Sequence, residues 1–154
     1  EKYRRTIELA PNHKAAHNNL GVALAGHGQL TEAASHYVHV LRVDPTDSQA
    51  HNNLGTVLAR RGQLDKAIMH FDKALSTNPE YHDAQSNRGR ALAQLGRHNE
   101  AADQLAALAA TFAADGQLNQ ALETAQRALE YAILTGNDTA SQAIRNQLKR
   151  YRDE

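Results

Sequence analysis

The sequence of 154 residues has no cysteine and no tryptophan, and it contains only two phenylalanines and three prolines. The absence of cysteine excludes disulfides, cysteine-ligated zinc and thiol catalysis. Because large aromatic side chains are scarce, the core has to be built from small, closely spaced helices that rely on alanine and leucine. These absences favour an all-α fold.

The chain also lacks a net charge and a long apolar run. Lys and Arg together number 17, as do Asp and Glu, so the basic surface typical of nucleic-acid binding is missing. No segment approaches the roughly 20 apolar residues that cross a bilayer, and the first residues, EKYRRTIELA, lack the apolar core of a signal peptide. We therefore expect no nucleic-acid partner and no membrane insertion in this segment, and we favour a cytoplasmic location.

What the chain does contain is an internal repeat. The hexapeptide AHNNLG occurs at 16–21 and recurs at 50–55. The same offset relates three glycines and all the prolines: Gly21, Gly55 and Gly89, and Pro11, Pro45 and Pro79. A fixed period of this length, about 34 residues, is typical of a solenoid whose units are helix pairs.

Each unit predicts two helices joined by a glycine turn. The expected helices cover 14–27 and 31–43, then 48–61 and 65–77, then 82–95 and a helix from about 98. Four glycines are expected to end the first helix of a pair in the left-handed conformation: Gly28, Gly62, Gly96 and Gly116. The glycines and alanines that recur inside the helices are expected to let two backbones pack closely.

These residues resemble the tetratricopeptide repeat (TPR) family, whose pattern is W-x2-L-G-x2-Y, then A-x3-F, then a proline. Leu20-Gly21 and Leu54-Gly55 match the L-G pair, and Ala33 with Tyr37 and Ala67 with Phe71 match the second helix. The match is good over about residues 1–107, although His17, His51 and Gln85 replace the tryptophan and Leu105 replaces the aromatic of the third unit. The resemblance implies an all-α, right-handed superhelical solenoid of antiparallel helix pairs with a C-terminal capping helix.

The repeat loses its register after the third unit. The alanine that follows Ala101 in the pattern is Ala121, which lies about 14 residues short of the position that the period requires. Either the segment NEAADQLAALAATFAAD forms one helix of about 17 residues that serves two pairs, or a segment is absent from the chain. We expect a single domain over 1–154, divided into a partial repeat (1–13), repeats at 14–47 and 48–81, a repeat with the register break (82–115), a partial repeat (116–136) and a capping helix (137–154).

The first helices of TPR units line a concave groove, and Asn19, Asn53 and Asn87 occupy the same position of successive units. This row is similar to the asparagine ladder of the O-linked N-acetylglucosamine transferases, which grips peptide backbones because an amide both donates and accepts. Alternatively, the amides bond to neighbouring repeats. The other predicted groove residues share this face: Asn18, Gln49, Asn52, Thr56, Arg60, Asp83 and Arg90.

The groove predicts a non-catalytic scaffold that binds a peptide or partner protein. Neither a phosphate-binding loop nor a catalytic motif is present, so we expect no enzymatic activity and no cofactor. The basic residues of the dicarboxylate clamp in chaperone-binding TPRs are missing from the equivalent positions. His13 and His17, like His36 and His39, have the spacing of one helix face, but no carboxylate completes either set, so we expect no metal.

Two other functions stay open. The C-terminal segment resembles the end of bacterial TPR proteins, some of which carry membrane or glycosyltransferase domains upstream, so the chain is alternatively the substrate-recruiting arm of a larger enzyme. The beginning inside a repeat unit fits that reading. Alternatively, Tyr3, Ile7 and Ala10 predict an open apolar face on the first helix, through which copies of a structural scaffold would self-associate.

Overall fold

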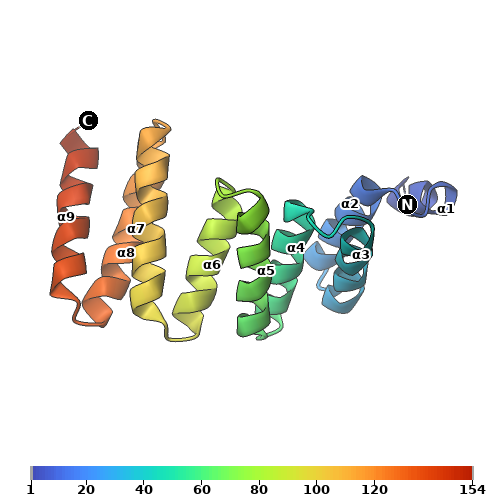
Figure 1. The fold of residues 1–154 in the computed structure, drawn as a ribbon, viewed down its shortest axis with the longest axis horizontal. Coiled ribbons are helices and arrows are strands. Elements are labelled where there is room, and N and C mark those ends of the chain that lie inside the picture. Colours follow the sequence, from blue (N-terminus) through green and yellow to red (C-terminus); the bar gives the residue numbers. More distant parts are fainter. Residues whose placement is uncertain (1, 154) are drawn as a thin grey trace. The chain divides into compact units, whose positions relative to one another are not determined.

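The computed structural model describes residues 2–153, and this part of the chain contains nine α-helices and no strand (Figure 1). The helices are α1 (Lys2–Leu9), α2 (Lys14–Gly26), α3 (Leu30–Val43), α4 (Ser48–Arg60), α5 (Leu64–Thr77), α6 (His82–Gln94), α7 (His98–Ala114), α8 (Leu118–Leu134) and α9 (Asp138–Asp153). They lie close to the predicted bounds, which confirms the all-α solenoid of helix pairs. Glu1 and Glu154, the outer ends of the first and last predicted segments, lie outside the described residues.

In the described part of the chain, five turns between helices contain a glycine with positive φ. The predicted set of Gly28, Gly62, Gly96 and Gly116 is confirmed, and Gly136 joins it. At Gly62 the φ of 73° lets the amides of Gly62 and Gln63 bond back to Ala59 and Leu58. A side chain at this φ would meet its own backbone, so glycine is the residue that ends α4 at least cost.

The chain divides into two compact units, residues 1–84 and 85–154. In the first unit, α2 packs against α3 and α4 packs against α5, while α1 contacts α2 and α3 contacts α4. Its core includes Leu24, Tyr37 and Val57. Ala33 and Ala67, two of the recurring alanines, are completely buried. Small side chains at these positions let the paired helices approach closely.

In the second unit, α7 is a single helix of 17 residues, as expected for the segment after the register break. It packs along α8, and α9 packs against both. Leu105 and Leu108 of α7 share one buried cluster with Ala125 and Ala128 of α8. Helix α9 buries Ile144, Leu148 and Tyr151 in that cluster while most of its other side chains are exposed, which is the pattern of a capping helix.

The apolar face predicted for helix α1 is only partly exposed in the structure. Tyr3 is 36% exposed, but Ile7 packs against the core cluster of the first unit. Ala10 follows the last residue of the helix and does not extend its face. The apolar row is therefore partly used inside the chain, and the surface left for a second copy is smaller than the spacing suggested.

Candidate functional site

Most predicted groove residues of the first unit lie on α2 and α4, at very different depths. Asn18 and Asn52 are 4% and 6% exposed, so they offer little surface to a partner. The Nδ2 of Asn52 donates to the Tyr81 hydroxyl over 3.4 Å. One repeat apart, these two asparagines act mainly in the packing of the helix pairs.

Asn19 and Asn53, one position further along each helix, are more accessible. Asn19 is exposed and Asn53 is half-buried. The Nδ2 of Asn53 is buried and has no hydrogen-bond partner among the described residues. A buried amide donor without an acceptor costs about 1–3 kcal/mol, so an acceptor at this position would be stabilising.

The remaining predicted residues divide between free and internally bonded side chains. Gln49 and Asp83 are exposed. The Thr56 hydroxyl donates to the carbonyl of Asn52 over 2.9 Å. Arg60 donates to the carbonyl of Ala25 over 2.7 Å, which places a cation at the C-terminal end of α2, where the helix dipole favours it.

Asn87 and Arg90 lie on α6 in the second unit, where they contact each other. The Arg90 guanidinium donates to the Oδ1 of Asn87, and Asn87 is half-buried while Arg90 is exposed. The amide oxygen of Asn87 is thus engaged within its own helix, whereas the amide nitrogen of Asn53 has no partner among the described residues. The three asparagines share a repeat position, but their hydrogen bonding differs.

The structure also brings together histidines that the spacing along one helix did not pair. His51 of α4 lies against His70 of α5, with 2.9 Å between their Nδ1 atoms. The Nε2 of His51 is 3.0 Å from the carbonyl oxygen of Pro45. One repeat earlier His17, His36 and Pro11 repeat this arrangement, with distances of 2.9 Å. The recurrence of both histidines at the repeat period was the signal in the sequence, but their contact depends on how the hairpin folds.

The carbonyl of Pro45 fixes one proton of the pair. A carbonyl oxygen only accepts, so the Nε2 of His51 carries a proton, and the Nδ1 atoms of His51 and His70 share a second hydrogen bond. Burial, together with the charges of His51 and Lys73, lowers the pKa of His70 to about 4. Burial and the neighbouring His17 lower the pKa of His36 in the same way. His70 and His36 are therefore neutral at physiological pH.

Neither histidine pair completes a metal site in the described part of the chain. Residues 2–153 contain no group of three or more His, Cys, Asp or Glu side chains that could hold a metal ion. His39, the third histidine near His17, stacks on its ring with centroids 4.0 Å apart, which directs the two rings face to face rather than towards one ion.

Among the described helices, none is long and apolar enough to cross a membrane.

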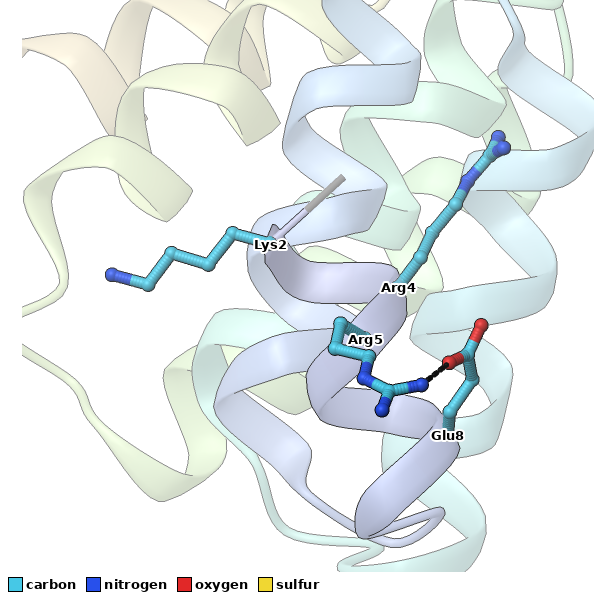
Figure 2. Close-up of a pocket in the computed structure, with 4 residues that line it drawn as sticks. All are labelled: Lys2, Arg4, Arg5 and Glu8. Atoms are coloured by element: carbon cyan, nitrogen blue, oxygen red, sulfur yellow. Dashed lines mark hydrogen bonds and ion pairs between the residues drawn. The ribbon is translucent and has the colours of Figure 1, made fainter.

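A shallow hollow on α1 is lined by Lys2, Arg4, Arg5 and Glu8 (Figure 2). Figure 2 shows Arg5 and Glu8 turned towards each other, and their ion pair measures 2.9 Å. Arg4 reaches Glu32 of α3 at 3.8 Å. Two of the three cations therefore have carboxylate partners within the chain, which leaves a weakly basic surface.

Comparison with known proteins identifies the repeat. The family model described as tetratricopeptide repeat matches residues 1–38, 25–76 and 52–117. No curated protein sequence matches the chain. Among solved structures, YrrB, described as a TPR protein with an unusual peptide-binding site, superposes with a TM-score of 0.66 at 18% identity, covering 100% of this chain and 94% of that chain. MamA superposes with a TM-score of 0.62 at 19% identity, covering 88% and 87%. The chain belongs to the tetratricopeptide repeat family.

Proposed function

We propose that this chain is a non-catalytic scaffold that binds an extended segment of a partner protein along the exposed face of its first helices, with Asn19 and Asn53 as central contacts. The observation that carries the proposal is the buried Nδ2 of Asn53, which has no acceptor among the described residues. A backbone carbonyl of a bound peptide would supply that acceptor. An amide also accepts from the peptide N–H, so one side chain can hold the backbone with little dependence on peptide sequence.

The surroundings of Asn53 support this face as a binding surface. Exposed Asn19 lies one repeat earlier, and exposed Gln49 lies one helical turn from Asn53. The same TPR scaffold carries a peptide-binding site in YrrB. This binding role suits both a free-standing scaffold and the recruiting arm of a larger enzyme.

The proposal is tested by changing the amides and comparing captured proteins. Asn19→Ala combined with Asn53→Ala should remove most partners from an affinity capture analysed by mass spectrometry. Asn119→Ala, which removes an exposed amide at the start of α8, is the matched control and should keep them. Far-UV circular dichroism should show equal helix content in all three proteins. Recovery of the same partners by the double variant would contradict the proposal.

A further inference from the structure

Two adjoining hollows lie on another surface of the first unit, beside the second helices α3 and α5. One has a volume of about 320 Å³ and is lined by side chains from α3, α4 and α5. The other, of about 410 Å³, is lined by α3 and by Arg61 at the end of α4. Val38 and Arg42 border both, so the hollows form one continuous surface, here called the α3–α5 groove. It is distinct from the asparagine face described above.

The charges along the α3–α5 groove are all of one sign. Its lining contains Arg42, Arg61 and Lys73 and no carboxylate, although acidic and basic residues are equal in number in the whole chain. None of the three cations forms an ion pair with another described residue. The hollow on α1 differs, because Glu8 pairs with Arg5 there. Three uncompensated cations in one groove favour an anionic partner.

Between the cations, the groove is apolar. Val38 is 37% exposed at the junction of the hollows, and Leu41 and Leu54 line the wall formed by α3 and α4. His51 and His70 line the same hollow, and the contact between their Nδ1 atoms joins the two rings to each other. An apolar side chain seated there would remove Val38 from water while acidic neighbours reach the cations.

The length of the groove indicates a polypeptide. From Thr31 to Arg42 the lining follows α3 for about 16 Å at 1.5 Å per residue. About five residues of an extended peptide span that distance, whereas a small carboxylate fills only one hollow. No Phe, Tyr or Trp side chain lines the groove, so the stacking surface that single-stranded nucleic acid uses is missing.

We propose that the α3–α5 groove binds an acidic segment of a partner protein, with an apolar side chain on Val38 and carboxylates at Arg42, Arg61 and Lys73. This second interaction surface goes beyond the proposed peptide-backbone site. It leaves the face of Asn19 and Asn53 available, so one chain can bind two segments at once. Two sites on one scaffold raise the effective concentration of either partner segment at the other site.

The probe for this groove is a fluorescein-labelled peptide of about ten residues in which pairs of Glu flank single Leu residues, and a second peptide replaces every Glu by Gln. Fluorescence anisotropy with the full chain should show saturable binding of the Glu peptide that weakens with added salt. The Gln peptide should not bind. Arg42→Glu combined with Lys73→Glu should weaken binding about tenfold or more, because two attractions become repulsions. Val38→Ser should weaken binding without changing the dependence on salt.

A matched charge control separates a site from general attraction. Lys66→Glu combined with Lys149→Glu makes the same change in net charge at exposed residues outside the groove and should leave binding unchanged. Equal weakening by both double variants would overturn the proposal, as would the absence of saturable binding up to about 1 mM peptide. Tighter binding of a single-stranded oligonucleotide that Arg42→Glu with Lys73→Glu abolishes would also overturn it. Asn19→Ala with Asn53→Ala should leave the Glu peptide bound. A failure of the proposed asparagine face can therefore be told apart from a failure of the α3–α5 groove.

Discussion

Gly55 lies so close to the ring of Phe71 that a Cβ on it would be 2.6 Å from the Phe71 Cε1 atom. Phe71 is 1% exposed, so a shift of its ring would have to displace other core residues. The carbonyl of Ala67 would be 3.1 Å from the same Cβ. We predict that Gly55→Ala lowers the free energy of unfolding by about 1–3 kcal/mol, the usual effect of overpacking a helix contact, in urea denaturation followed by circular dichroism.

Gly26 provides the matched control for this prediction. It is the last residue of α2, and a Cβ there would meet nothing within 4 Å. Gly26→Ala should therefore be neutral or stabilise by up to about 1 kcal/mol, because alanine loses less backbone entropy in a helix. If Gly55→Ala were as harmless as Gly26→Ala, the close approach of α4 and α5 at Phe71 would be wrong.

The fold was predictable because its determinants repeat along the sequence. Gly21 recurs as Gly55, and each faces an aromatic ring at the same separation along the chain, Tyr37 or Phe71. Residues that make the same contact in each helix pair recur at the repeat period in the sequence, and so do the glycines of the turns. The 17-residue helix α7 was one of two explanations that the register break left open, and no helix-breaking residue interrupts it.

The candidate sites were less predictable, because they depend on depth and on partners across helices. Asn52 and Asn53 are neighbours in sequence, yet one packs inside and the other has a donor without an acceptor. Adjacent residues of a helix point in directions about 100° apart. Sequence spacing alone does not show which of the two side chains points towards a neighbouring helix. The α3–α5 groove is lined by residues from three helices. The sequence contains no motif for it, because none of its cations has a lysine or arginine one repeat before or after it.

The lowered pKa of His70 predicts that acid destabilises the first unit. The unfolded chain takes up a proton near the ordinary histidine pKa of 6.5, whereas folded His70 does so only near pH 4. Stability is therefore complete above pH 6.5 and falls as the pH drops from 6.5 towards 4. His36, with its pKa lowered in the same direction, adds to the slope. Urea unfolding at several pH values across this window should show the decline.

His70→Gln isolates the contribution of one pair. Glutamine keeps an amide donor for the Nδ1 of His51 but takes up no proton, so stability should depend less on pH between 6.5 and 4. Asp44, whose pKa is held at about 2 by Lys14 and Thr46, loses its contribution only below pH 4 and does not confuse the comparison. His27→Gln, which removes an exposed imidazole, is the control. Parallel curves for His70→Gln and the unchanged protein would contradict the role of the pair.

The start of α4 is capped more strongly than the equivalent start of α2. The Oδ1 of Asp47 accepts the amide of Ala50 over 2.8 Å, whereas His13, one repeat earlier, accepts the amide of Ala16 with its Nδ1 over 3.2 Å. A carboxylate makes the stronger cap because its charge also interacts favourably with the N-terminal end of the helix dipole. The role of the caps can therefore be tested in two ways, by removing the carboxylate at position 47 and by introducing one at position 13.

Asp47→Ala should lower the free energy of unfolding by about 1 kcal/mol, and His13→Asp should raise it by about 0.5–1 kcal/mol. Lys14 contacts Asp47 at 3.7 Å but keeps its shorter bond of 2.6 Å to Asp44, so the loss in Asp47→Ala arises mainly from the cap. Asp47→Asn retains an acceptor for Ala50 and should lose less than Asp47→Ala. Thermal and urea unfolding at pH 7 measure all three variants. Destabilisation by His13→Asp would show that the histidine at this position does more than cap the helix.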